Sequence, residues 1–326
     1  MNTGTVNTII GHQAGDALTT GNNNVAVGHE ALGAEVQGDQ SVAVGVGALQ
    51  AQTNSTDADA DNTAVGYNAG VAVTTGIQNV LIGKGAGDAL TDADFNVAVG
   101  VDALTADTEG SSSVAVGRRT LHAQNLTTQT TTRNTAVGFE AGNDITTGVF
   151  NTLLGSNAGD ALTDADSNVA VGVNALGTDT LGSRSTAVGL SALQTQNFTT
   201  ATDSHNTAVG NQAGFAVTTG TKGTFIGSEA GIAVNTGTEN TCVGFQAGLN
   251  LTSGSNNTYI GSLAGFNTTN GGNNVVVGHD CALAGQSTTN AIGMGFEVTT
   301  QSNNNFTFGN GATDSNIAFG GTSVTA

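Results

Sequence analysis

The sequence repeats a short phrase at regular steps, and this repeat limits what the chain can fold into. NTAVGYNAG at 62–70 returns as NTAVGFEAG at 134–142 and as NTAVGNQAG at 206–214, so the chain contains a long repeat with a constant step. Within one long repeat, a looser version of the phrase recurs in three steps of 17 and one of 21. Its seventeen central glycines run from Gly11 to Gly293, with a last step of 15. Such a chain is expected to stack many copies of one structural unit.

Each copy of the phrase alternates in the manner of a β-strand. The residue before the central glycine is almost always Val, Ile or Leu, as at Val65 and Ile82, and the residue two places earlier is Thr or Val. Seventeen residues are too few for two helices and a turn, and an alternation of period 2 with one buried face is typical of a strand. We therefore predict an all-β parallel β-solenoid of about 17 turns over 1–293, with a core of stacked Val, Ile and Ala. A divergent, stalk-like segment follows at 294–326.

Asparagine and glycine recur at fixed places in the phrase, where we predict structural roles. Stacked Asn side chains can hydrogen-bond along the solenoid as a ladder. The central glycine is expected at a corner that needs a positive φ or a very close backbone neighbour. The residues singled out for these roles are Asn62, Gly66, Asn134, Gly138, Asn206 and Gly210.

The charge balance excludes some partners. The chain of 326 residues has a net charge of −19, with Lys+Arg 6 and Asp+Glu 25. Binding to nucleic acid or to anionic membranes needs clustered Lys and Arg, and the one basic cluster, Arg118–Arg119, is interpreted as a solvated pair. No apolar run approaches the ~18 residues of a membrane-spanning helix. The first fifteen residues lack the features of a signal peptide, which predicts that the chain is not exported on its own signal.

Three longer turns interrupt the regular step, at 50–61, 122–133 and 194–205. They vary in sequence while the phrase around them does not, and variable loops on a rigid scaffold commonly carry recognition; the alternative is that they are tolerated insertions. The candidate receptor-contact residues are Gln50, Thr53, Asn54, Asp57, His122, Asn125, Thr128, Arg133, Gln194, Asn197, Phe198 and His205.

Two acidic rows resemble the start of a calcium loop, because oxygen-bearing side chains alternate along them. The predicted ligands are Asp92, Asp94 and Asn96 in one row and Asp164, Asp166 and Asn168 in the other. The alternative is a solvated acidic edge, since the glycine and the distal glutamate of an EF-hand are absent. No cofactor other than calcium is expected.

Other reactive residues point away from catalysis. His12 and His29 occupy the same place in consecutive turns, so we expect them one strand spacing apart. Cys242 takes a place that is Ala in most copies, and it is expected with Cys281 to be a small buried thiol. No catalytic triad order, phosphate loop or zinc motif is visible, and we predict that the chain is not an enzyme.

The repeated phrase resembles the head repeat of YadA-like trimeric autotransporter adhesins. It is still more similar to the NTAIGYQAG-type arrays in tail-fibre proteins of marine and cyanobacterial phages, over about residues 7–326. The resemblance implies a left-handed β-roll in which three chains associate side by side. It also implies a structural virion protein located in a phage tail fibre, whose partners are other copies of itself, other tail proteins and a host-surface receptor.

Two rival functions share this fold. The first is the head domain of a bacterial trimeric adhesin, located on the extracellular surface. The second is an ice-binding solenoid, which needs a flat threonine array on every turn. The threonine pairs of this chain, such as Thr74–Thr75, recur once in each long repeat and not in every turn, which disfavours the second rival.

Overall fold

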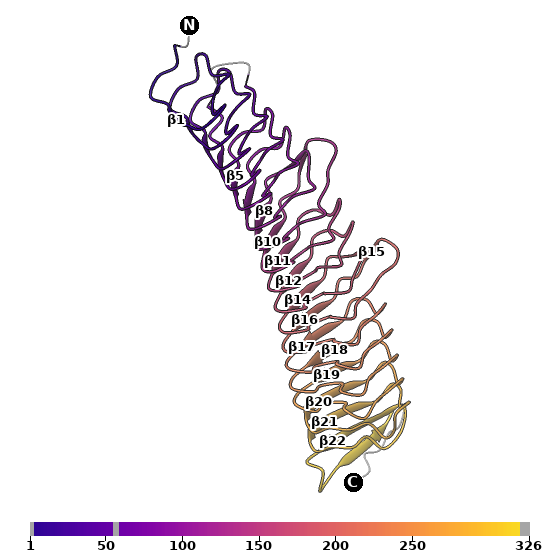
Figure 1. Cartoon of the computed structure of the whole chain (residues 1–326). Coiled ribbons are helices and arrows are strands. Elements are labelled where there is room, and N and C mark those ends of the chain that lie inside the picture. The colour runs from indigo at the N-terminus through magenta and orange to yellow at the C-terminus, as the bar shows by residue number, and fades with distance from the viewer. Residues whose placement is uncertain (1–2, 55–58, 320–326) are drawn as a thin grey trace. The chain divides into compact units, whose positions relative to one another are not determined.

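The computed structural model describes residues 3–54 and 59–319, and these residues form a parallel β-solenoid (Figure 1). Contacts between residues divide the chain into two units, Met1–Asp166 and Ser167–Ala326. The described residues contain no α-helix, and therefore no apolar helix of membrane-spanning length.

The first unit consists of short strands, most of them three residues long. Nine of those described form one parallel ladder in the order β1, β2, β3, β4, β5, β6, β8, β10, β11. Their bounds, with those of the outlying β7 and β9, are β1 (Thr8–Ile10), β2 (Val25–Val27), β3 (Val42–Val44), β4 (Thr63–Val65), β5 (Val80–Ile82), β6 (Val97–Val99), β7 (Gly110–Ser111), β8 (Val114–Val116), β9 (Thr130–Thr131), β10 (Thr135–Val137) and β11 (Thr152–Leu154).

The second unit is built in the same way. Its described strands form a parallel ladder in the order β12, β14, β16, β17, β18, β19, β20, β21, β22, and β23 closes it by pairing antiparallel to β22. The bounds are β12 (Val169–Val171), β13 (Gly182–Ser183), β14 (Thr186–Val188), β15 (Thr202–Asp203), β16 (Thr207–Val209), β17 (Thr224–Ile226), β18 (Thr241–Val243), β19 (Thr258–Ile260), β20 (Val275–His279), β21 (Ile292–Phe296), β22 (Asn305–Gly309) and β23 (Ser315–Ala318).

The central glycines stand at corners where no side chain fits, as predicted. Gly66 has φ +145°, and a Cβ placed on it would lie 2.4 Å from the carbonyl oxygen of Gly83 in the next turn. Gly138 and Gly210 have φ of +145° and +143° and equally close backbone neighbours. The corner therefore needs glycine for two reasons, a positive φ and the approach of the next turn.

The recurrent asparagines join successive turns, although their main partners are backbone groups. Asn62 Oδ1 accepts the backbone N–H of Asn79 at 2.9 Å, and Asn62 Nδ2 donates to the carbonyl of Gly76 at 2.7 Å. Asn134 and Asn206 make the same two bonds to the following turn. All three side chains are buried. Each asparagine thus satisfies a backbone donor and a backbone acceptor that would otherwise be left unpaired in the interior.

The interior is narrow, and its volume is balanced from turn to turn. The middle strand residue is usually a fully buried Ala, and in most of these turns the place four residues after the corner holds a buried Leu, as at Leu32 and Leu104. Where the middle residue is the larger Leu81, the same place is Gly70 in the turn before and Gly87 in its own turn. A Cβ on either glycine would lie within 2.8 Å of the Leu81 side chain. Large and small residues therefore alternate to keep the interior close-packed.

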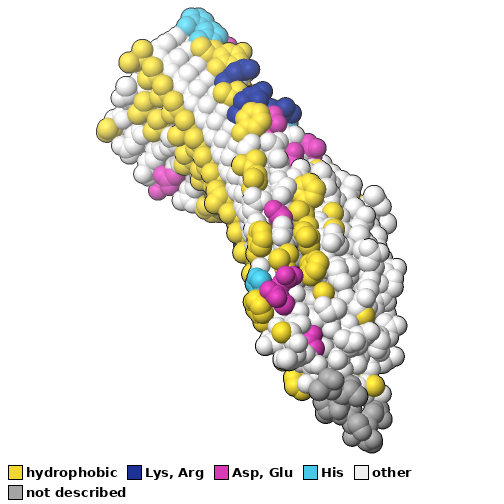
Figure 2. Space-filling view, turned by 90° about the horizontal axis from the view of Figure 1, so that it is seen from below, with side chains coloured by type: hydrophobic (Ala, Val, Ile, Leu, Met, Phe, Trp, Pro, Cys, Tyr) yellow, Lys and Arg dark blue, Asp and Glu magenta, His cyan; other side chains and the backbone are white. Residues whose placement is uncertain are grey.

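The Val and Ile residues on either side of the middle strand residue do not form the core, which corrects the predicted core of stacked Val and Ile. They face outward. In the first unit the residue before the corner is at least half-buried at most turns but exposed at others, including Ile82 (38 %) and Leu154 (47 %). The residue after the corner is an exposed Tyr67 or Phe139 in some turns. Figure 2 shows such apolar side chains gathered in rows on the surface.

The end of the ladder corrects the predicted place of the last corner. Gly293, taken as a central glycine after a step of 15, pairs with Val276 and lies in the middle of β21. The corner falls at Gly295, which pairs with Gly278 at the usual step of 17 and has φ +141°. The ladder then continues into β22, where Gly309 pairs with Gly295 after a step of 14.

Candidate functional site

The long turns use their extra residues to add a short second ladder beside the main one. In the second long turn, β9 (Thr130–Thr131) pairs in parallel with β7 (Gly110–Ser111) of the preceding turn. In the third, β15 (Thr202–Asp203) pairs with β13 (Gly182–Ser183), and the loop that leads to β15 projects from its unit (Figure 1). In the first, a single bridge joins Asp39 and Asp59.

A fully buried carboxylate holds the base of the second long turn. Asp107 Oδ1 accepts the backbone N–H of Gly110 at 3.1 Å and that of Leu126 at 3.0 Å. Asp107 Oδ2 accepts a hydrogen bond from Gln124 Nε2. The Gln124 Oε1 atom in turn accepts from Asn134 Nδ2 at 2.9 Å. This network fixes both ends of the turn, because a buried charge is tolerated only with its lone pairs satisfied.

The same anchor is present under the other two long turns. Asp179 accepts from the backbone of Gly182 and Phe198 and from Gln196. Glu35 accepts in the same way from the backbone of Gly38 and Asn54 and from Gln52. Sequence reasoning missed these acids. The signal that identifies them is an acid three places before a glycine, followed one regular step later by Gln, in each of the three copies: Glu35 with Gln52, Asp107 with Gln124 and Asp179 with Gln196.

The candidates in the first long turn differ in accessibility. Thr53 is exposed, and the half-buried Gln50 donates from Nε2 to Glu30 Oε2 at 2.7 Å. Asn54 is a buried anchor residue and not a surface contact, because its Nδ2 donates to Glu35 Oε2 at 3.1 Å. Asp57 lies outside the described residues.

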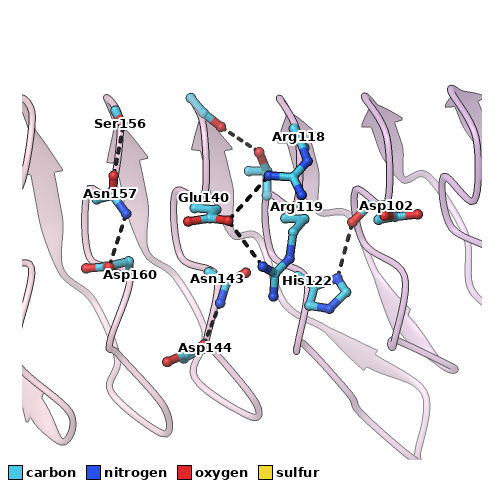
Figure 3. Close-up of polar contacts among 12 residues, drawn as sticks. Asp102, Arg118, Arg119, His122, Glu140, Asn143, Asp144, Ser156, Asn157 and Asp160 are labelled. Atoms are coloured by element: carbon cyan, nitrogen blue, oxygen red, sulfur yellow. Dashed lines mark hydrogen bonds and ion pairs between the residues drawn. The ribbon is translucent and has the colours of Figure 1, made fainter.

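In the second long turn the predicted residues are mostly at the surface. Asn125, Thr128 and Arg133 are exposed, and the Arg133 guanidinium lies 5.9 Å from the centre of the Phe150 ring. His122 is half-buried, with Nδ1 at 3.4 Å from the carbonyl oxygen of Asp102 (Figure 3). The exposed tip of this turn is 127–129.

The third long turn contains one clear correction. Asn197 and His205 are exposed and Gln194 is half-buried, but Phe198 is only 5 % exposed. A Cβ placed on Gly182 would lie 2.7 Å from the Phe198 ring, so the ring packs against the preceding turn. Phe198 is therefore a packing residue at the base of the turn and not a surface contact.

Each acid of the predicted calcium rows has at least one carboxylate oxygen in a hydrogen bond between turns. Asp94 Oδ1 accepts the N–H of Ile77, and Asp92 accepts from Thr75 and Gln129. Asn96 is fully buried and serves in the asparagine ladder. The second row repeats this pattern at Asp164, Asp166 and Asn168. Within the part of the chain that the structure describes, no three acidic, His or Cys side chains converge as metal ligands.

The basic cluster is an ion-pair group at the surface. Arg118 Nη1 and Arg119 Nη1 lie 3.7 and 3.2 Å from Glu140 Oε1 (Figure 3), and the Arg118 guanidinium also lies over the Phe139 ring at 5.5 Å. Such exposed pairs add little stability, and Glu140 offsets part of the local positive charge.

The histidine and cysteine predictions are confirmed in position. The rings of His12 and His29 stack with their centres 5.2 Å apart, which is close to one strand spacing. Cys242 and Cys281 are free and buried, and burial raises the pKa of the Cys242 thiol to about 12.

Comparison with protein-family models, with curated proteins and with solved structures found no match. A functional proposal therefore depends on the geometry of the chain, on its outward apolar rows and on its long turns. Each has a rigid, buried polar base and, at the second and third turns, an exposed tip that stands out from a regular ladder.

Proposed function

We propose that this chain is the shaft and head of a homotrimeric surface fibre, a structural virion protein of a phage tail. In this proposal the regular ladder sets length and stiffness, and the exposed tips of the long turns contact a host-surface receptor. The proposal includes a non-catalytic role and the left-handed, three-chain β-roll that the repeat resembles.

The observation that carries the proposal is the set of outward apolar columns, which are the rows of side chains before and after each corner glycine. In the first unit the residues before and after the corner glycine include exposed Ile82, Leu154, Tyr67 and Phe139. Register places equivalent residues of successive turns directly beside one another, as Val65 lies beside Ile82. Long contiguous apolar surfaces are uncommon on monomers and mark association sites. The place before the corner is apolar in turn after turn, although the place after the corner varies. A parallel copy of the chain is therefore the partner that would match this column along its length.

Native mass tests the association. Light scattering on a sizing column should give three times the 32.0 kDa mass of the chain. Ile82→Asp or Leu154→Asp should lower the mass to that of one chain, because each places a charge within the apolar column of every subunit. Thr127→Asp, which adds the same charge at an exposed tip, should leave the trimer intact. A wild-type chain that runs as a monomer would refute the proposal.

Receptor contact is tested separately. Removing 127–129 deletes the exposed tip of the second long turn but keeps Asp107, Gln124, Leu126 and β9 in place. The shortened chain should keep its mass and melting temperature and bind host cells more weakly. Full binding after deletion of the tips of all three turns would restrict this chain to the shaft.

The alternative, the head of a bacterial trimeric adhesin, is supported by the same apolar columns. The neighbouring coding sequence distinguishes the two proposals. A tail-fibre gene lies among phage tail genes, and an adhesin is encoded with a membrane anchor.

A further inference from the structure

A hollow lies where the second long turn folds back over the ladder. Its walls are Asp94 and Phe95 of one turn, Ser111 and Ser112 of the next, and residues 129–131 of the long turn. Gln129 Nε2 donates to Asp92 Oδ2 at 2.9 Å, a contact between residues 37 apart. This bond holds the tip of the turn above the hollow. The volume is about 270 Å³, just below the roughly 300–1,000 Å³ of pockets for drug-sized ligands, which suits a single sugar ring.

Phe95 gives the hollow an open aromatic wall. Its side chain is 53 % exposed and its φ is +61°, a backbone region that is unfavourable for a bulky residue. The neighbour of Phe95 at the same place in the next turn is the small Ser112, so no large side chain in that column covers the ring on this side. Phe150 occupies the same place in a later turn, but Arg133 lies over its ring at 5.9 Å. Of these two rings, that of Phe150 is covered by Arg133, and that of Phe95 is open to a ligand.

Polar groups surround this ring. Asp94 Oδ1 is held by the N–H of Ile77, while Oδ2 has no protein partner among the contacts of the described residues. Ser112, Thr131 and Gln129 also line the hollow; their side chains carry two hydroxyl groups and an amide, whose Nε2 is engaged by Asp92 and whose Oε1 can accept a hydrogen bond. A pyranose ring presents an apolar C–H face, which packs on an aromatic ring, and hydroxyl groups, which bond to carboxylate, amide and hydroxyl side chains. The nearby Asp92 and Asp94 disfavour an anionic sugar.

We propose that this hollow binds one neutral sugar unit of a cell-surface polysaccharide. This inference rests on the proposed receptor-contact function and gives the chemical class of the receptor.

The other two copies of the long turn lack the residues on which the proposal depends. The counterpart of Phe95 is Ser167 one long repeat later and Asn23 one long repeat earlier, and the counterpart of Gln129 is Ala201. The counterpart of Thr131 is Asp203, whose Oδ2 is engaged by Arg184 Nη1 at 2.7 Å. The sugar site therefore belongs to the second long turn alone.

Binding of the labelled full chain to an array of neutral and acidic oligosaccharides tests the proposal. At least one neutral glycan should bind, and saturation-transfer NMR should place it beside the phenylalanine protons. Phe95→Ser, which introduces the residue found at the counterpart Ser167, should weaken binding at least tenfold, as should Gln129→Ala. Phe150→Ser is the matched control, because it removes the same ring from the same place in another turn, and it should bind as the wild type does.

The outcomes separate this proposal from the one on which it rests. Equal binding by the Phe95→Ser variant, or preference for acidic glycans, overturns the sugar site. If no glycan binds but the chain is a trimer that attaches to cells through 127–129, the sugar site is overturned and the fibre stands. A monomeric chain refutes the fibre itself.

Discussion

Gln124 donates a hydrogen bond to Asp107 of the preceding turn, and neither side chain has any exposed surface. This pair fixes the second long turn to the ladder, since Asp107 also accepts from the backbone of Gly110 and Leu126. The tip at 127–129 consists of exposed side chains, whereas the base of the turn is a buried network. Sequence changes at the tip therefore leave the packing of the base intact.

The donor role of Gln124 and the acceptor role of Asp107 can be tested. Asp107→Asn presents one acceptor to three donors and should lower the free energy of unfolding by about 2 kcal/mol, the cost of a buried polar group left unsatisfied. Adding Gln124→Glu reverses donor and acceptor, so the double variant should recover at least half of the loss. Urea denaturation of the wild type, both single variants and the double variant measures the coupling. Losses that simply add would mean that the two residues do not depend on each other.

The corner glycines should tolerate no side chain. Gly66→Ala would set a Cβ 2.4 Å from a carbonyl oxygen at φ +145°, and we expect it to cost more than about 3 kcal/mol. Gly285→Ala is the control, because a Cβ there would meet nothing within 4 Å. Thermal melting followed by circular dichroism compares them; similar melting temperatures would show that the corner can relax.

The asparagine ladder should contribute through its backbone partners. Asn79→Ala leaves the N–H of Asn96 and the carbonyl of Ala93 without their partners, at a cost of about 2 kcal/mol in the free energy of unfolding. The exposed Asn211→Ala should change it by less than about 0.5 kcal/mol. Chemical denaturation measures both, and equal effects would argue that the ladder is not a source of stability.

Cys242 makes the fold sensitive to alkali. Its thiol is fully buried between Phe225 and Tyr259 in the strand register, and desolvation raises its pKa from 9.0 to about 12. Above pH 9 the unfolded chain releases this proton and the folded chain keeps it, so stability falls as pH rises from 9 towards 12, by about 1 kcal/mol per pH unit. Cys242→Ala places the residue found here in most turns, and it should reduce the loss of stability between pH 9 and 12. Urea denaturation at pH 8, 10 and 11 measures the difference; parallel curves would contradict it.

The architecture could be predicted from the sequence because each turn interacts mainly with the turns beside it. A short, constant step with alternating side chains already requires stacked strands, and the places of Asn62 and Gly66 in the phrase indicate a ladder and a corner. The step also brings His12 beside His29. Nothing beyond the local repeat is needed for these inferences.

The candidate site was predicted less well, because side chains in the long turns look alike in sequence. Phe198 and Asn54 lie within the same variable segments as Asn197 and Thr53, yet the first two are buried and the others exposed. Burial there depends on Asp179 and Glu35, which belong to the preceding turn. Sequence alone also gave no reason to associate Phe95 with Gln129, which lies two turns further along the chain.

The repeat alone determined that the chain is a parallel β-solenoid, where its corners lie over most of its length, and which turns are long. Only the tertiary structure decided which face of each strand is inside. Alternation defines two faces but does not assign them. A closed turn this short leaves room inside for Ala and one larger residue, so the Val and Ile that flank each middle strand residue face outward. The close approach of successive turns, set by hydrogen bonding between strands, then brings Phe95 and Gln129 to the walls of one hollow.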